Sequence, residues 1–256
     1  MNFKHRIFLS LALAGLAASS QAALVTVRFD NPIFSGVPAP SYDVVTITYP
    51  KLVGTGSQSA TVAAGRLQGT VLAYSGVDPS IFVDNLNDLF MYCYDLYDHI
   101  NHGQKVDYTI NLDGEQARTL DFLGAVNAVL NQGAPAYDNF AWLHPRTGAV
   151  SAAIQLGIWE SRYETGAWNI AGGSFKATGI ESNTLAALGR FFGAIDSSDS
   201  LNRKYVMTLE APGVQDMITG DPPATVPEPG TSALIGAALA GMLLARRRPA
   251  PPAATS

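Results

Sequence analysis

Cysteine is almost absent from this sequence: Cys93 is the single example among 256 residues. A cysteine-based metal site needs further ligands at suitable spacing, and no second cysteine is present. Charged residues are also scarce, at 14% of the chain with a formal net charge of −5, and basic residues form no stripe away from the two ends. The negative net charge and the lack of a basic stripe argue against nucleic-acid binding. The sequence has no evident internal repeat, and the glycine-rich stretch at 166–179 lacks the spacing of a phosphate-binding loop.

Hydrophobic residues, by contrast, make up 47% of the chain. That proportion is enough for a sizeable buried core in one domain of ordinary size, once the two ends are set aside. We place this domain at residues 23–217 and expect a linker at 218–225.

The amino-terminal stretch, residues 1–22, has the three parts of a secretory signal peptide. Lys4 and Arg6 precede a short apolar run at 7–18, and small residues up to Ala22 suit a cleavage site. We therefore expect export, with a buried first helix as the alternative. In an exported protein an unpaired cysteine calls for an explanation.

The carboxyl-terminal stretch has the features of a second targeting signal. Pro227, Glu228 and Pro229 precede an apolar run at 231–245, and an arginine triplet follows at 246–248. These parts resemble the PEP-CTERM sorting signal of Gram-negative bacteria that make exopolysaccharide, with bounds at 226–248 and a tail at 249–256. The resemblance implies that an exosortase-type enzyme processes the Pro-Glu-Pro region.

Before processing, the apolar run would form a transmembrane helix in the inner membrane, and the arginine triplet would hold its end on the cytoplasmic side. The run is shorter than the usual span of about 17 to 25 residues. The alternative is a plain membrane anchor that leaves the protein tethered.

The periodicity of the remaining chain predicts an α+β fold. Alternating and β-rich stretches predict strands at 24–29, 42–49, 60–74, 89–96, 106–112 and 203–210, with a break near Gly65. Helical spacing of apolar residues predicts helices at 115–132, 148–164 and 184–195. From Ala211 onward the periodicity is lost. We expect a β-sandwich or barrel-like sheet with a helical insertion.

Two stretches of this pattern belong together. Tyr92-Cys93 lies in the strand predicted at 89–96, and Ile154-Gln155-Leu156-Gly157-Ile158-Trp159 lies in the helix predicted at 148–164. Together they resemble the thioester domains of bacterial surface adhesins, in which an aromatic-Cys segment on a strand faces a hydrophobic-Gln-x-x-hydrophobic-Trp segment on a helix. The resemblance runs from roughly residue 44 to 217. Gly157 stands where that family more often has alanine.

The resemblance implies an internal thioester cross-link between Cys93 and Gln155. A cysteine thiol that attacks a glutamine side-chain amide expels ammonia, and an amine can later open the activated acyl group. A thioester lies uphill of thiol plus amide in water, so the fold must hold the two groups in near-attack geometry and exclude hydrolytic water. A glutamine inside an apolar helix is also costly to bury without partners, and conversion to the thioester removes its NH₂ donor.

Neighbouring residues are expected to line this site. Tyr92 and Tyr94 flank the cysteine, and Trp159 lies one helical turn after the glutamine, where it could roof the bond. Asp95 and His99 follow the cysteine closely. They either tune the thiol or cap the local backbone, and the sequence leaves both options open.

Other functions are compatible with these residues. A lone cysteine is usually a small buried hydrophobe and a glutamine near a tryptophan usually packs, which would make this a noncovalent structural or exopolysaccharide-matrix protein. His99 and His102 also lie close behind Cys93, as a thiol hydrolase or a metal site could require. In cysteine hydrolases the catalytic histidine lies far from the cysteine in sequence, unlike His99 and His102. A metal site would need a further ligand, and His144 is the only other histidine available for it. We therefore expect no catalytic residue, no metal and no cofactor.

The sequence thus predicts an exported protein at the cell surface or in the extracellular biofilm matrix of a Gram-negative bacterium. Its thioester would capture an amine-bearing surface or matrix component covalently, in adhesion or matrix attachment. Each molecule would react once, so we expect no enzyme.

Overall fold

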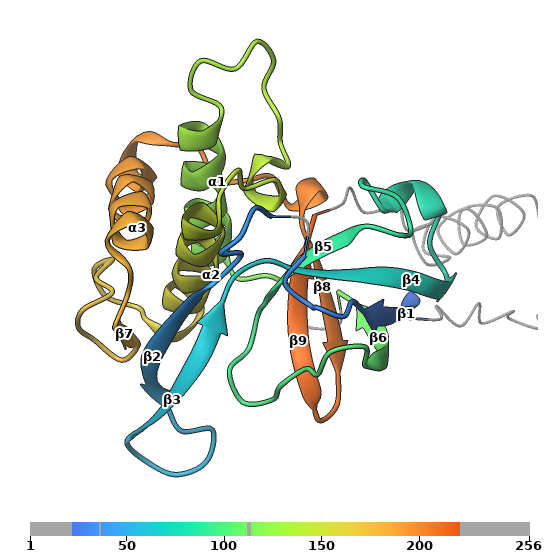
Figure 1. Cartoon of the computed structure of the whole chain (residues 1–256), viewed down its shortest axis with the longest axis horizontal. Coiled ribbons are helices and arrows are strands. Elements are labelled where there is room, and N and C mark those ends of the chain that lie inside the picture. Colours follow the sequence, from blue (N-terminus) through green and yellow to red (C-terminus); the bar gives the residue numbers. More distant parts are fainter. Residues whose placement is uncertain (1–21, 36, 112–113, 221–256) are drawn as a thin grey trace, which may run out of the picture. The chain divides into compact units, whose positions relative to one another are not determined.

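A closed six-stranded antiparallel barrel, a separate three-stranded sheet and three helices make up the described part of this computed structural model, which covers residues 22–35, 37–111 and 114–220 (Figure 1). This arrangement confirms the predicted α+β fold with a barrel-like sheet and a helical insertion. Residues 1–21 of the signal peptide predicted at 1–22, and the sorting signal predicted at 226–248, lie outside the described residues.

The barrel strands pair in a ring in which strands distant in sequence become neighbours. Half-buried strands alternate between buried and exposed side chains, and β1 and β6 follow this pattern, with the Phe29 and Tyr108 rings meeting edge to face at 6.4 Å between centroids. The order round the ring is β1 (Leu24–Phe29), β4 (Leu67–Ser75), β5 (Leu89–Cys93), β9 (Val214–Thr219), β8 (Met207–Ala211) and β6 (Lys105–Ile110).

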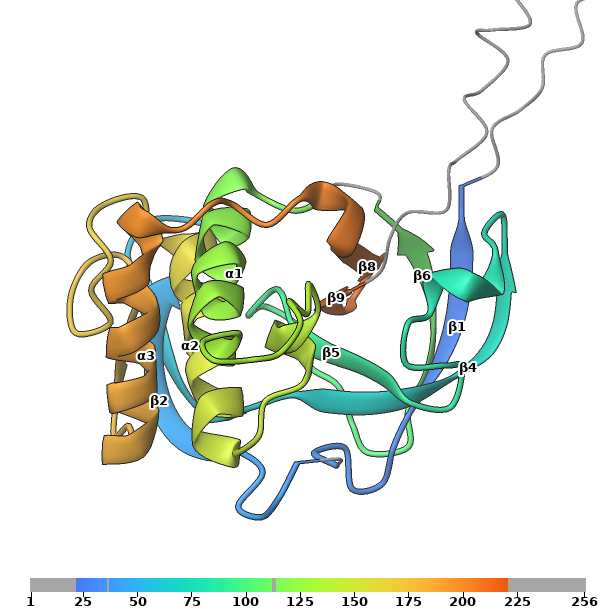
Figure 2. The ribbon, with the colours of Figure 1, turned by 90° about the horizontal axis from the view of Figure 1, so that it is seen from above.

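The helices gather on one side of the barrel (Figure 2). They are α1 (Ala117–Leu130), α2 (Gly148–Tyr163) and α3 (Ser182–Ala194). The small sheet runs in the order β3 (Ser57–Ala64), β2 (Asp43–Pro50) and β7 (Lys176–Thr178), and α2 contacts β2, β3 and both other helices. Most of α2 is therefore buried, as its apolar sequence predicts.

Close packing between α1 and α2 explains the glycine of the glutamine motif. A Cβ added to Gly157 would lie 1.9 Å from Cζ of Phe122, a fully buried ring of α1. Gly157 therefore lets the two helices approach at this point.

Three sequence predictions are wrong in detail. The cysteine strand ends at Cys93 instead of residue 96, because the Asp95 carboxylate accepts hydrogen bonds from the backbone N–H of Tyr97 and Asp98 and turns the chain. The chain does not lose regular structure after Ala211: a turn with Gly213 at φ 71° leads into β9, whose last residues had been placed in the linker. The strand predicted at 203–210 starts only at Met207, because Arg203–Tyr205 form a short 3-10 helix. The glycine-rich stretch, for which no strand was predicted, contains the short strand β7.

Within the described ranges, no helix is both long and apolar enough to cross a bilayer. The apolar run at 231–245, predicted as a transmembrane helix, falls outside those ranges.

Candidate functional site

The side chain of Gln155 is joined to the backbone of Cys93 by two hydrogen bonds. The Cys93 N–H donates to Gln155 Oε1 at 2.9 Å, and Gln155 Nε2–H donates to the Cys93 carbonyl at 2.8 Å. Gln155 is fully buried and Cys93 is 9% exposed. The two residues proposed from sequence as a reacting pair are thus neighbours, although 62 positions separate them in the chain.

The edge of β5 is open to Gln155 because β4 leaves it. The ladder between β4 and β5 extends only to the pair Leu67 and Met91. One residue before that pair, the backbone N–H of Arg66 turns to Ser151 Oγ on α2 at 2.7 Å. Ser151 and Gln155 lie one turn apart on α2, so they occupy the place along β5 that β4 vacates.

The opposite edge of β5 pairs with β9. Cys93 lies across from Met217, and the Tyr94 N–H donates to the Asp216 carbonyl at 2.7 Å. The cysteine is therefore held on one side by the last described strand and on the other by the glutamine amide.

Electrostatics keep the thiol protonated. Burial, helped by the neighbouring Asp95 carboxylate, raises the pKa of the Cys93 thiol well above its usual range. Cysteines of thiol hydrolases have lowered pKa values, so the shift at Cys93 has the opposite direction.

Cys93 lines a cleft of about 440 Å³ between the small sheet and the segment that follows β5. Of the residues predicted to line the site, His99 and Trp159 lie on this cleft, together with His102. The remaining lining residues include Ile47 and Tyr49 of β2, Ala60, Val62 and Ala63 of β3, and Leu96, Tyr97, Asp98 and Ile100 behind the cysteine. The cleft gives the thiol a route to solvent.

Tyr92 and Tyr94 do not line this cleft. They lie on the other face of β5 from Cys93, since side chains alternate along a strand. The Tyr92 hydroxyl donates to the Trp142 carbonyl at 3.1 Å, and the Tyr94 hydroxyl accepts from the Gln116 N–H at 2.8 Å. Both rings therefore attach β5 to the helical side.

Asp95 has a structural role next to the cleft, because its two carboxylate oxygens accept from the backbone N–H groups of residues 97, 98 and 216. Gln215, which sequence reasoning missed, donates to the Asp95 carbonyl at 3.0 Å and lines the cleft. No sequence signal pointed to Gln215, because the alternation of β9 is too weak to indicate a strand.

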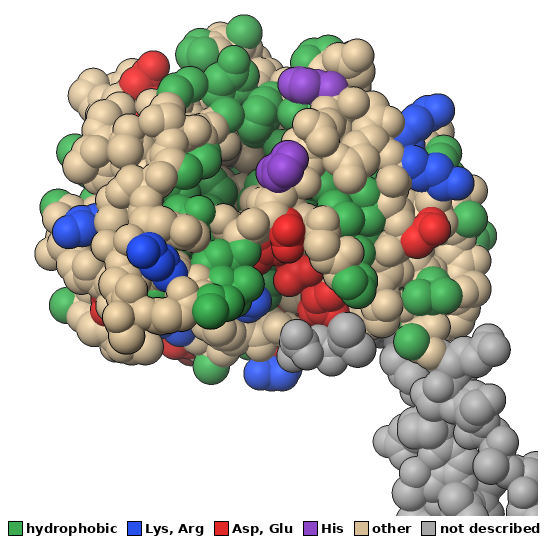
Figure 3. Space-filling view, turned by 90° about the horizontal axis from the view of Figure 1, so that it is seen from below, with side chains coloured by type: hydrophobic (Ala, Val, Ile, Leu, Met, Phe, Trp, Pro, Cys, Tyr) green, Lys and Arg blue, Asp and Glu red, His purple; other side chains and the backbone are tan. Residues whose placement is uncertain are grey.

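The face of the molecule that carries the β2–β3 hairpin and the β5–β6 connection has a mixed surface (Figure 3). Histidine and acidic side chains lie among apolar ones there. Across residues 22–35, 37–111 and 114–220, no group of three or more His, Cys, Asp or Glu side chains could hold a metal ion. His102 accepts a hydrogen bond at Nδ1 from the Ile33 N–H at 3.0 Å.

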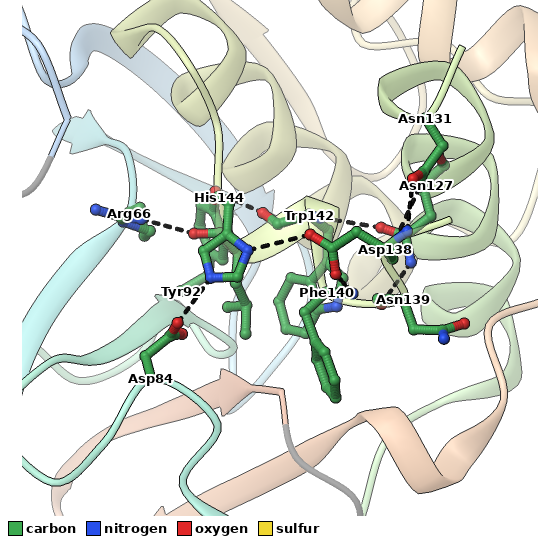
Figure 4. Close-up of polar contacts among 11 residues, drawn as sticks. Arg66, Asp84, Tyr92, Asn127, Asn131, Asp138, Asn139, Phe140, Trp142 and His144 are labelled. Atoms are coloured by element: carbon green, nitrogen blue, oxygen red, sulfur yellow. Dashed lines mark hydrogen bonds and ion pairs between the residues drawn. The ribbon is translucent and has the colours of Figure 1, made fainter. Parts of the chain in front are cut away.

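A separate polar cluster surrounds His144 (Figure 4). Its Nε2 lies 2.9 Å from Asp84 and its Nδ1 lies 3.3 Å from Asp138, and the hydrogen bond to Asp84 is the main reason that the pKa of His144 is raised. Next to it, Arg66 donates to the Leu143 carbonyl at 2.7 Å. This cluster ties the β4–β5 connection to the segment between α1 and α2.

Comparison with protein families gives a match in the sorting signal. Residues 225–248 match the family described as the PEP-CTERM protein-sorting motif, which confirms the sorting signal predicted at 226–248. The chain is therefore an exported protein of the kind that an exosortase-type enzyme recognises and that is transiently membrane-anchored. Comparison with curated proteins and comparison with solved structures each give no match.

Proposed function

We propose that this exported protein forms an internal thioester between Cys93 and Gln155 and uses it to capture an amine-bearing partner. The observation that carries the proposal is the paired hydrogen bonding of the Gln155 amide to the Cys93 backbone, at 2.9 and 2.8 Å. This contact fixes the carboxamide beside the residue that bears the thiol, and proximity of this kind removes much of the entropic cost of the reaction.

Formation of the bond balances without a cofactor. The Cys93 Sγ–Cδ bond to Gln155 forms, the Cδ–Nε2 bond breaks, and the thiol proton leaves with the amide nitrogen as ammonia. The Cys93 N–H, which contacts Oε1, would stabilise the negative charge that develops on that oxygen. Starting groups and products are all neutral, which suits a buried site where charged forms are disfavoured.

In the capture step, the amine of the partner would reach the thioester through the cleft. An amine nitrogen forms a bond to Gln155 Cδ, the Cδ–Sγ bond breaks, and a proton from the amine restores the thiol of Cys93. His99, exposed at the cleft, would accept a proton from the incoming amine. Trp159, 2% exposed, would limit the access of water to the bond. The protein would thereby become attached to a surface or biofilm matrix component, as in adhesion. Each molecule would react once, so there would be no catalytic turnover.

One observation favours a second function. The carbonyl oxygen and the NH₂ group of Gln155 both have a hydrogen-bond partner in Cys93, so the buried amide is satisfied without any covalent bond. The alternative is a noncovalent structural or exopolysaccharide-matrix protein in which Cys93 and Gln155 are core residues.

The mass of the intact protein separates the two functions. We would measure it for the purified protein before and after incubation with methylamine. A mass short by one ammonia, which methylamine raises and which is absent in Cys93→Ala, supports the thioester. A mass equal to that calculated from the sequence of the purified protein, with no methylamine adduct, would refute the thioester and favour the noncovalent protein.

The site of attachment gives a second check. Peptide mapping should find methylamine on residue 155 and a free thiol on residue 93. An adduct on any other residue would contradict the assigned carbonyl. A thiol hydrolase would instead turn over a substrate and lose that turnover in Cys93→Ala and His99→Ala.

A further inference from the structure

The β3 strand, Ser57–Ala64, is an edge strand that borders the cleft leading to Cys93. Its register with β2 is unbroken over all eight residues, and among the described residues no strand pairs with its other side. Ala60, Val62 and Ala63 line the cleft opposite the segment that follows Cys93. Side chains of β3 therefore form part of one wall of the cleft.

The backbone groups on this free edge follow from the hairpin. The Lys51 N–H donates to the Gly56 carbonyl at 3.1 Å, so the neighbouring pair of Pro50 and Ser57 is not hydrogen-bonded, and bonded pairs then alternate along the ladder. Ala60 and its alternate neighbours thus bond to β2. Residues 59, 61 and 63 direct their N–H and C=O groups to the free edge.

Three of the usual protections of an edge strand are missing from β3. Natural edges are blunted by charged residues, proline, bulges or a covering element. The sequence Ser-Gln-Ser-Ala-Thr-Val-Ala-Ala has neither charge nor proline, and its register has no bulge. A regular row of alternating donors and acceptors is complementary to the backbone of another extended polypeptide.

The charges around the cleft favour a cationic side chain on a polypeptide that binds this edge. No lysine or arginine occurs among the described residues that line the cleft, whereas Asp98 does. The buried Asp95 carboxylate accepts hydrogen bonds from the N–H groups of Asp98 and Asp216, so two further acidic residues lie next to this lining, with Arg162 as the cation near Asp216. The cleft therefore favours an incoming ammonium group over an acidic one.

We propose that the free edge of β3 binds an extended segment of a partner polypeptide by strand addition and thereby presents a lysine of that segment to Gln155. The inference rests on the proposed thioester for the reaction, and it adds the docking element and the class of partner. Side chains of an added strand alternate in direction, and those that share the side of Ala60 and Val62 point into the cleft.

The test uses the purified full-length protein and eight-residue peptides in which valine and threonine alternate, acetylated at the amino terminus, each with one lysine; the alternation fixes which face of the peptide turns to the apolar cleft. The lysine is moved one position at a time along the peptide. We expect covalent labelling to rise and fall with a period of two, because only alternate positions reach the cleft. Equal labelling at all positions would overturn the strand-addition geometry.

A matched pair of variants tests the edge itself. Thr61→Pro removes an N–H that points to the free edge, a place where edge strands tolerate proline, and Thr61→Ala keeps that N–H. We expect Thr61→Pro to lower peptide labelling about tenfold, with Thr61→Ala close to wild type and methylamine labelling unchanged in both. Equal peptide labelling of the two variants would overturn the proposal.

The controls separate the two proposals. Absence of both methylamine and peptide labelling in the wild type would refute the thioester, and the docking proposal with it. Methylamine labelling without the Thr61→Pro effect would refute the docking alone. If the edge instead pairs with a second copy of the chain, Thr61→Pro would abolish a dimer seen in light scattering, which would also overturn the proposal.

Discussion

Replacing Gln155 with alanine removes the group that completes the free side of β5. The Cys93 N–H and C=O would lose their partners at 2.9 and 2.8 Å, in a region where Gln155 itself is fully buried. An unsatisfied buried polar group costs about 1 to 3 kcal/mol, so two groups cost about 2 to 6 kcal/mol before any relaxation. Because Cys93 lines the cleft, water can reach part of this site, and we expect a loss of about 2 to 4 kcal/mol.

The matched control is Cys93→Ala. Both variants lack any thioester, but Cys93→Ala keeps its backbone groups paired with the glutamine amide, so the difference between the two reports the paired hydrogen bonds together with the packing lost at residue 155. The free energy of unfolding is measured by urea titration, with the fluorescence of the buried Trp142 and Trp159 as the signal. If Gln155→Ala is no less stable than Cys93→Ala, Gln155 does not support the end of β5 as described.

Three further predictions concern stability. Gly157→Ala should destabilise the protein by about 1 to 2 kcal/mol, because the overpacking against Phe122 exceeds the gain in helix propensity; a urea midpoint equal to wild type would contradict this, and Gly193→Ala, at a position with open space, is the control. Burial raises the pKa of Glu160 to about 7, so the folded state binds its proton more tightly than the unfolded state and stability falls as the pH rises from about 4.5 to 7. Glu160→Gln should therefore raise the free energy of unfolding at pH 8 by about 1 to 3 kcal/mol, and an equal change at pH 4 would show that the charge is not responsible. The raised pKa of His144 means that its stabilising contact with Asp84 is fully present below pH about 6.5 and is lost as the pH rises through the folded-state pKa; His144→Gln should flatten that part of a profile of Tm against pH, and an unchanged profile would contradict it.

Much of the fold could be predicted because periodicity is local information. The strand at 24–29 matches β1 residue for residue, and the predicted helix at 148–164 differs from α2 by one residue. β9 was missed because its sequence is short, follows a Pro-Gly turn and is buried on both faces near its end, which weakens the alternation. The short β7 depends on its pairing with β2, and no local pattern marks it.

The candidate site was predictable in its two central residues and not in its surroundings. Cys93 and Gln155 came from a resemblance of motifs, and the structure brings them together. The cleft, in contrast, has a wall built by β2 and β3, strands that the sequence analysis did not connect with the site. Tyr92 and Tyr94 flank the cysteine in sequence, but the two-residue period of a strand turns them to the other side.

The position of β9 bears on the order in which the protein can assemble. This strand is the last described element, and it lies between β5 and β8 in the ring. A chain that has been delivered only as far as residue 213 contains Cys93, Gln155 and all three helices, yet its barrel is open beside the cysteine. Residues 214–219 close the ring, so the environment of the thiol is completed only when nearly the whole domain is available for folding. The sorting motif begins within a few residues of β9, so the segment that completes the cysteine site and the sorting motif are near neighbours in the chain.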